Sequence, residues 1–149
     1  MKLIPYEKSQ DIIEMFALKS GVLLINSFGE IQPNKETILE RKDYQLFGIQ
    51  DSTGLFVGAS DLLFNKKHGT AKAAIYLENS SVSLSSVVLY LKEYAINVGL
   101  MKISIFIFCS EQSIADTMKS CGFLPEIKHR SHLFIGGTLF PMTEYGCLL

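Results

Sequence analysis

A cluster of serines lies where this chain is predicted to pass from a strand into a helix. The strand is the segment 70–77, and the helix is the segment 83–98. At such a junction the free N–H groups of the first helical turn and the helix dipole favour a phosphate or another anion. Serine hydroxyls add donors, although serines here also serve as ordinary helix caps and turn residues. The serines concerned are Ser80, Ser81, Ser83, Ser85 and Ser86.

Several side chains near this junction could move protons. Glu78 and Glu111 follow predicted strands, so either carboxylate could accept a proton, and Tyr145 in the last predicted strand could donate one. Each also has an ordinary interpretation, since glutamates are usually solvated and strand tyrosines are usually half-buried. Asp61 lies within an apolar segment and is either a substrate-facing carboxylate or the outward residue of an alternating strand.

The histidines and cysteines form no recognisable metal site or catalytic dyad. His129 and His132 are three residues apart on a predicted strand, so their side chains point to opposite faces. The three cysteines are widely spaced, and no histidine lies near Cys109 in the sequence to activate it. We therefore expect free thiols, no bound metal and no covalent intermediate on the protein.

Length and composition indicate one globular domain over residues 1–149. Hydrophobic residues make up 48% of the chain and charged residues 19%, enough apolar material for one core. The net charge is −1 without a basic block, so we expect no nucleic-acid partner. No apolar run approaches the ~20 residues of a membrane span, and the N-terminus lacks a signal-peptide core, so we expect a cytoplasmic protein.

Hydrophobic periodicity predicts an alternation of strands and helices. A strand at 2–7 precedes a helix ending before Gly21 and a short helix at 35–41. Alternating segments separated by turns then predict an antiparallel meander. A helix stopped by Gly99, a buried strand, a second helix and two closing strands follow. The predicted ranges from the meander onward are 44–50, 55–64, 70–77, 83–98, 102–108, 110–120, 126–135 and 139–148.

The carboxyl end carries the closest resemblance to a known family. Its sequence "CGFLPEIKHRSHLFIGGTLFPMTEYGCLL" resembles the closing pattern of the GNAT superfamily of acyl-CoA-dependent N-acetyltransferases, and is similar to the branch that acetylates ribosomal-protein N-termini. The resemblance covers Tyr44–Leu149. The matching residues are Gly122, Phe123, Glu126, Arg130, Gly137, Tyr145, Gly146 and Leu148.

This resemblance implies an α+β fold with a GNAT-like mixed, mostly antiparallel sheet of six to seven strands flanked by helices. It implies an N-acetyltransferase in which a small amine or a peptide N-terminus attacks acetyl-CoA, or another acyl-CoA, directly in a ternary complex. The proton-transferring residues would be Tyr145, Glu111 and Glu78. The exposed closing strands make a homodimer compatible with this picture.

The resemblance also implies where the cofactor lies. In the resembling enzymes two neighbouring strands separate, the pantetheine arm lies between them, and the pyrophosphate lies on the following loop and helix. Here that gap falls between "AAIYL" and "KISIFIF". The turn 66–68 either meets the 3′-phosphate of CoA or is a solvated hairpin. The implied cofactor-binding residues are Ile75, Tyr76, Leu77, Ser81, Val82, Ser83, Leu84, Ser85 and Ser86.

Two departures from the family pattern keep other functions open. Asn79, Val82 and Leu84 stand where the family has Arg or Gln, Gly, and Gly or Ala, so the phosphate loop has no glycine. Met118 stands where the family often has the tyrosine that protonates the leaving thiolate. The alternatives are a catalytically impaired GNAT-fold binding or assembly module, and an acyltransferase fed by a carrier protein.

Overall fold

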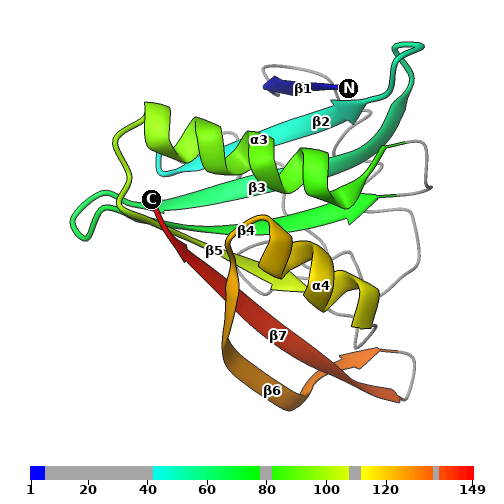
Figure 1. The fold of residues 1–149 in the computed structure, drawn as a ribbon, viewed down its shortest axis with the longest axis vertical. Coiled ribbons are helices and arrows are strands. Elements are labelled where there is room, and N and C mark those ends of the chain that lie inside the picture. The colour runs from blue at the N-terminus through cyan, green and yellow to red at the C-terminus, as the bar shows by residue number, and fades with distance from the viewer. Residues whose placement is uncertain (6–41, 78–81, 108–111, 136–137) are drawn as a thin grey trace.

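The protein is built on one seven-stranded sheet with two helices packed on it (Figure 1). The structure, a computed structural model, describes residues 1–5, 42–77, 82–107, 112–135 and 138–149. The strand order is β1-β2-β3-β4-β5-β7-β6, so the expected α+β fold with a mixed, mostly antiparallel sheet is confirmed. The strands are β1 (Lys2–Pro5), β2 (Tyr44–Gln50), β3 (Phe56–Asn65), β4 (Thr70–Leu77), β5 (Lys102–Ile107), β6 (Leu124–Ile135) and β7 (Thr138–Leu148); the helices are α3 (Leu84–Asn97) and α4 (Gln112–Ser120).

The predicted meander forms β2, β3 and β4, which pair antiparallel through short turns. Gly54 and Gly69 have positive φ angles of 88° and 62°, which favour glycine. The Asp51 carboxylate organises the first turn by accepting from the backbone N–H groups of Thr53 and Leu55. The Thr53 hydroxyl, 2.6 Å away, also donates to it and lowers the pKa of Asp51. Local residues therefore determine this half of the sheet.

One face of the sheet carries the main core. Helices α3 and α4 both lie on this face in Figure 1, which we call the helix face. Phe47 of β2 makes edge-to-face contacts with Tyr94 and Tyr90 of α3, at centroid distances of 5.1 and 6.4 Å. The largest fully buried side chains are Phe47, Phe123, Ile49, Leu62, Leu91, Ile103, Ile105, Met118 and Val87.

Element boundaries largely agree with the sequence predictions. Helix α3 begins after its N-cap, Ser83, and ends at its C-cap, Val98, as the segment 83–98 predicted. Strand β1 is described as far as Pro5, and the last two residues of its predicted range lie outside the described residues. Strand β6 begins at Leu124, two residues before its predicted start. The helices predicted before Gly21 and at 35–41 lie outside the described residues. Within the described part of the chain, no helix is long and apolar enough to cross a membrane.

Strands β6 and β7 form a long hairpin that joins the sheet through β5. A register irregularity between Pro125 and Ile127 sets off Glu126, whose carboxylate lies over Gly146 of β7. From there it forms an ion pair with Lys102 of β5 at 2.7 Å. A side chain on residue 146 would occupy the space of this carboxylate, so Gly146 is what lets the ion pair cross β7.

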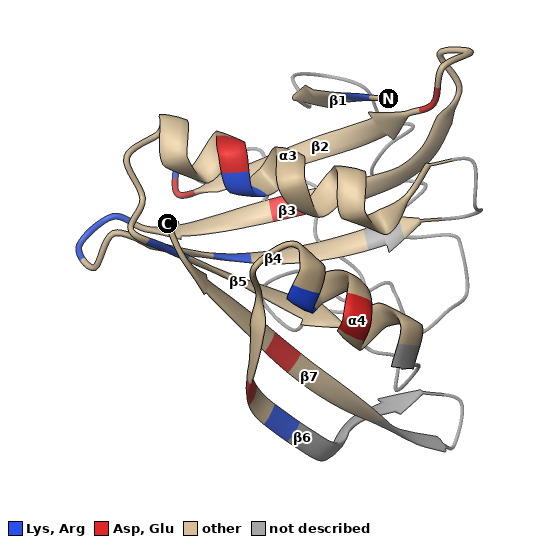
Figure 2. Ribbon diagram, in the orientation of Figure 1, with Lys and Arg blue, Asp and Glu red and all other residues tan. Residues whose placement is uncertain are grey.

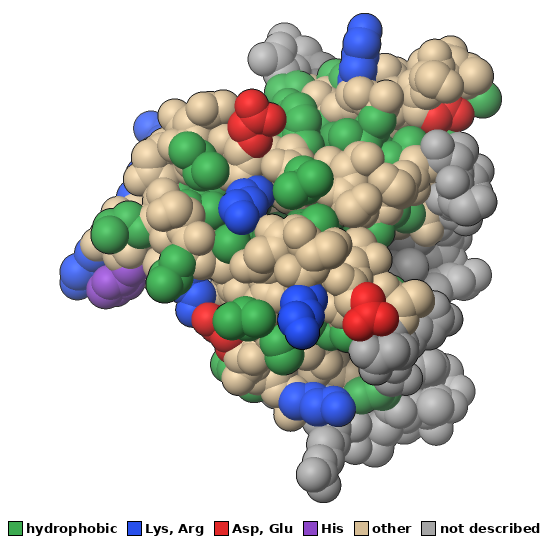
Figure 3. Space-filling model, viewed as in Figure 1, with side chains coloured by type: hydrophobic (Ala, Val, Ile, Leu, Met, Phe, Trp, Pro, Cys, Tyr) green, Lys and Arg blue, Asp and Glu red, His purple; other side chains and the backbone are tan. Residues whose placement is uncertain are grey.

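Charged side chains are spread over the described helices and strands rather than gathered on one element (Figure 2). On the helix face, apolar side chains alternate with lysines and carboxylates (Figure 3). The exposed apolar residues of α3 and its C-terminal end are Leu89, Ile96 and Val98.

Candidate functional site

Strands β4 and β5 form the parallel pair of the described sheet, and they separate before β4 ends. Their register runs from Thr70 opposite Lys102 to Ala74 opposite Phe106. Strand β4 continues to Leu77 beyond that last pair. The described pairing thus ends at Ala74, within the segment "AAIYL" that was predicted to border the gap. Main-chain groups beyond a last pair are available to another ligand.

Two buried side chains of β3 bind the backbone of Ala74, where β4 leaves β5. Asp61 Oδ1 accepts from the Ala74 N–H at 2.8 Å, and the Ser60 hydroxyl donates to the Ala74 carbonyl at 2.8 Å. Asp61 Oδ2 also accepts from the Tyr44 hydroxyl at 2.8 Å. Asp61 is fully buried, so the expectation of an outward surface residue is wrong. Its carboxylate binds the backbone at the last paired row instead.

The strand-to-helix junction is capped by Ser83. Its hydroxyl oxygen accepts from the Ser86 N–H at 3.3 Å and lies 2.7 Å from the Ser86 hydroxyl, so the interpretation of these serines as helix caps is confirmed for Ser83. Val82 is buried in the core, and Leu84 packs against that core. The apolar side chains of this segment are therefore packed into the protein. The serine hydroxyls remain at the exposed start of α3.

Tyr145 lies on the helix face of β7. It pairs with Ile105, and both belong to the core that includes Met118 of α4. The side chain is 6% exposed, and burial raises the pKa of its hydroxyl above 10.0. A raised pKa keeps the phenol protonated at neutral pH, as a proton donor requires. Tyr145 and Met118 are therefore members of the same buried core.

Glu144, the residue before Tyr145, was not among the site residues predicted from the sequence. Glu144 is 6% exposed, although glutamate is rarely buried without a partner. It pairs with Phe106, the last residue of β5 that is paired with β4. Because neighbours on a strand point to opposite faces, alternation along β7 places the Glu144 side chain on the face opposite that of Tyr145. Its importance depends on where β4 and β5 separate, and that is a tertiary feature.

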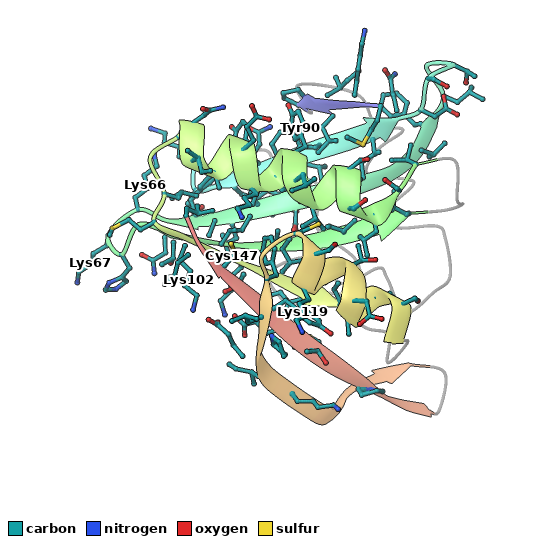
Figure 4. All side chains as sticks on the ribbon, in the orientation of Figure 1. Lys66, Lys67, Tyr90, Lys102, Lys119 and Cys147 are labelled. Atoms are coloured by element: carbon teal, nitrogen blue, oxygen red, sulfur yellow. The ribbon has the colours of Figure 1, made fainter. Side chains whose placement is uncertain are left out.

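Other predicted site residues are either not described or lie elsewhere. Glu78, Glu111 and Ser81 fall outside the described residues, and the side chain of Tyr76 is not described. The turn 66–68 does not approach the start of α3, because all of β4 separates the two. Figure 4 shows Lys66 and Lys67 at the end of the sheet away from the N-terminus of α3. This geometry favours the interpretation of the turn as a solvated hairpin.

A cavity of about 430 Å³ lies at that same remote end, where β2, the β3–β4 turn and the end of α3 meet. Lys42, Lys66 and Tyr94 contribute to its lining. It is separate from the point where β4 and β5 part. Among the described residues, no group of three or more His, Cys, Asp or Glu side chains could hold a metal ion.

Comparison with solved structures relates this fold to known proteins. A chimera of spermidine N-acetyltransferase SpeG from Vibrio cholerae and hSSAT superposes with a TM-score of 0.78 at 17% identity, covering 99% of this chain and 96% of that one. SpeG from Vibrio cholerae in complex with manganese ions gives 0.75 at 15% identity, covering 99% and 91%. A dodecameric SpeG structure in an intermediate state gives 0.66 at 17% identity, covering 76% and 69%. No family model and no curated protein matches the sequence. The chain shares its fold with these N-acetyltransferases.

Proposed function

We propose that this protein is an N-acetyltransferase that transfers an acetyl group from acetyl-CoA to a small amine. The observation that carries the proposal is the end of the β4–β5 pairing at Ala74 and Phe106, followed along the chain by the serine-capped start of α3. A pantetheine arm would pair with the edge of β4 beyond Ala74. The CoA pyrophosphate would lie at the N-terminus of α3, where free N–H groups and the helix dipole favour it.

The proposed cofactor contacts fall into two groups along this path. Ile75, Tyr76 and Leu77 follow the last paired residue of β4, and their backbone would bind the arm. Ser81, Val82, Ser83, Leu84, Ser85 and Ser86 would form the phosphate-binding turn, with backbone N–H groups and hydroxyls as donors. Burial of the Val82 side chain supports this, because it removes bulk from the outside of the turn.

The acceptor is proposed from the solved neighbours. These neighbours are spermidine N-acetyltransferases, so spermidine is the first acceptor to test, with a peptide N-terminus as the second. Tyr145 would give a proton to the leaving thiolate, and Glu78 and Glu111 remain proposed proton acceptors. One neighbour is dodecameric, which supports testing self-association by light scattering.

Thermal unfolding with saturating acetyl-CoA, CoA or pantetheine tests the proposal. A ligand at 100 times its Kd adds about 2.7 kcal/mol, a rise of several degrees for this size. We expect Ser83→Glu to abolish the rise with CoA, since its carboxylate would repel the pyrophosphate, while Ser83→Asn retains a cap and the rise. A response to pantetheine equal to that of CoA would favour a carrier-fed enzyme. No response would favour a non-catalytic module.

A further inference from the structure

A buried carboxylate on β7 has no recorded partner in the described part of the chain. Glu144 is 6% exposed, and no hydrogen bond or ion pair to its carboxylate is found among the described residues. Burying a charge without compensation is unfavourable, and unsatisfied buried polar groups are rare. Such a group fits a site completed by a ligand. The ligand that a carboxylate requires is a cation or a hydrogen-bond donor.

The register places Glu144 beside the point where the sheet opens. Asp61 of β3 pairs with Ala74, Ala74 with Phe106, and Phe106 with Glu144. Directly paired residues share a face, so these four side chains stand on the face opposite the helix face. Phe106 is the last β5 residue paired with β4. Glu144 therefore lies across β5 from the gap proposed to hold the pantetheine arm.

Among the described residues, the charged side chains that β3, β4 and β5 place on this face are already engaged. The two oxygens of Asp61 accept from Tyr44 and Ala74. Lys102 and Glu126 form an ion pair. The Lys72 ammonium lies 5.2 Å from the centroid of the Phe106 ring and has a further interaction of its own.

This distribution distinguishes Glu144 from its neighbours. Asp61 is held by the protein, whereas the Glu144 carboxylate keeps its capacity to bind. The ring between them already contacts one cation, so its face suits positive charge. These observations favour a protonated amine as the missing partner.

We propose that Glu144 binds the protonated acceptor amine and accepts its proton. This rests on the proposed function and names a residue for the acceptor side of the site. The Glu144 carboxylate takes one proton from the ammonium group, and the freed lone pair attacks the thioester carbonyl carbon. The C–S bond breaks, and the thiolate takes a proton from the Tyr145 hydroxyl. The second proton of the attacking nitrogen and the proton held by Glu144 both leave to solvent, and solvent reprotonates Tyr145. Both side chains are thereby restored, and the reaction yields an amide, CoA thiol and one released proton.

Glu144 and Tyr145, which are adjacent on β7, would supply the base and the acid of the reaction. Glu144 and Tyr145 point to opposite faces of β7, so the base and the acid would reach the thioester from opposite faces of the sheet, through the opening between β4 and β5. Burial raises the pKa of Tyr145, which keeps its hydroxyl protonated and suits its role as the proton donor.

The test compares Glu144→Gln with Glu93→Gln, which removes an exposed carboxylate from α3. Thermal unfolding is measured with acetyl-CoA alone, and with spermidine, putrescine or a peptide with a free N-terminus alone. Acetyl transfer is followed by thiol release. We expect Glu144→Gln to raise the KM for the amine or lower kcat by about tenfold to a hundredfold, the usual effect of removing a charged hydrogen-bond partner. The response to acetyl-CoA should stay unchanged, and Glu93→Gln should behave as the unmodified protein.

The outcomes separate this inference from the proposed function. Absence of any acetyl-CoA response in the unmodified protein refutes the proposed function, while loss of amine stabilisation in Glu144→Gln alone still supports the amine site. Equal amine responses in both variants, or no response of the unmodified protein to any of the three amines, refute the role of Glu144. Unfolding without ligand checks folding, and Glu144→Asp, which keeps the charge, should recover part of the amine response.

Discussion

The hydrogen bond between Tyr44 and Asp61 leads to a quantitative prediction about stability. The Tyr44 hydroxyl donates to a fully buried carboxylate over 2.8 Å, and Tyr44 itself is 8% exposed. Tyr44→Phe removes one oxygen atom and keeps the ring in place. A hydrogen bond to a buried charged group contributes about 1.5–3 kcal/mol, so we expect a loss of about 2 kcal/mol. For a chain of this size that corresponds to roughly 6 °C in Tm.

Urea denaturation of Tyr44→Phe and Tyr145→Phe measures this difference. Tyr145 is an internal control because it is equally buried, on the opposite face, and its hydroxyl has no recorded hydrogen bond in the described residues. We expect Tyr145→Phe to change the free energy of unfolding at neutral pH by less than about 0.5 kcal/mol. The contrast between the two variants isolates the hydrogen bond from the general effect of deleting a hydroxyl group.

A double-mutant cycle with Asp61→Asn tests whether the charge is responsible. When Asp61→Asn is already present, Tyr44→Phe should cost about 1 kcal/mol less, because the neutral amide is a weaker acceptor. If Tyr44→Phe and Tyr145→Phe lose the same stability, or if the two substitutions in the cycle are additive, the assignment of Asp61 as a charged acceptor is refuted. The explanation that a charged Asp61 carboxylate binds the backbone N–H of Ala74 would then also be refuted.

Three further predictions concern the cap, the hairpin and alkaline pH. Ser83→Ala should lose about 1 kcal/mol in urea denaturation, since the N-cap hydroxyl no longer accepts from the first turn; an unchanged value would contradict the cap. Gly146→Ala should displace the Glu126 carboxylate and lose the salt-sensitive part of the stability, less than about 1 kcal/mol, matching Glu126→Gln in low and high salt. The raised pKa of Tyr145 means that its favourable contribution is complete below pH 10.0 and is lost as pH rises through the folded-state pKa, so Tyr145→Phe should flatten the decline in stability above about pH 10; parallel declines in both proteins would contradict it.

Local patterns explain why much of the fold could be predicted from the sequence. The meander over β2, β3 and β4 has alternating residues and short turns, and α3 has a serine cap and a terminating Gly99. These signals act between near neighbours, so the sequence displays them directly. The start of β6 at Leu124 was less visible, because pairing with the last strand, not local propensity, extends it.

The candidate site was only partly predictable because its key features depend on distant pairings. The sequence indicated a gap near "AAIYL", but the register of β4 against β5 decides that it begins after Ala74. Asp61 was recognised as unusual in an apolar strand, while its hydrogen bond to Ala74 depends on that same register. The position of Glu144 beside the gap follows from its pairing with Phe106, which is the last residue of β5 paired with β4.

The parallel β4–β5 pair also has a consequence for the order of folding. The meander closes short loops, whereas joining β4 to β5 needs the whole of α3 as a crossover, and joining β5 to β7 spans α4 and β6. Long loops cost more entropy before their contacts form, so we expect the meander to assemble early and the β4–β5–β7 region late. A ligand bound where β4 and β5 part would then stabilise contacts absent from the transition state. It would lengthen the lifetime of the folded protein by slowing unfolding, while leaving the rate of folding nearly unchanged.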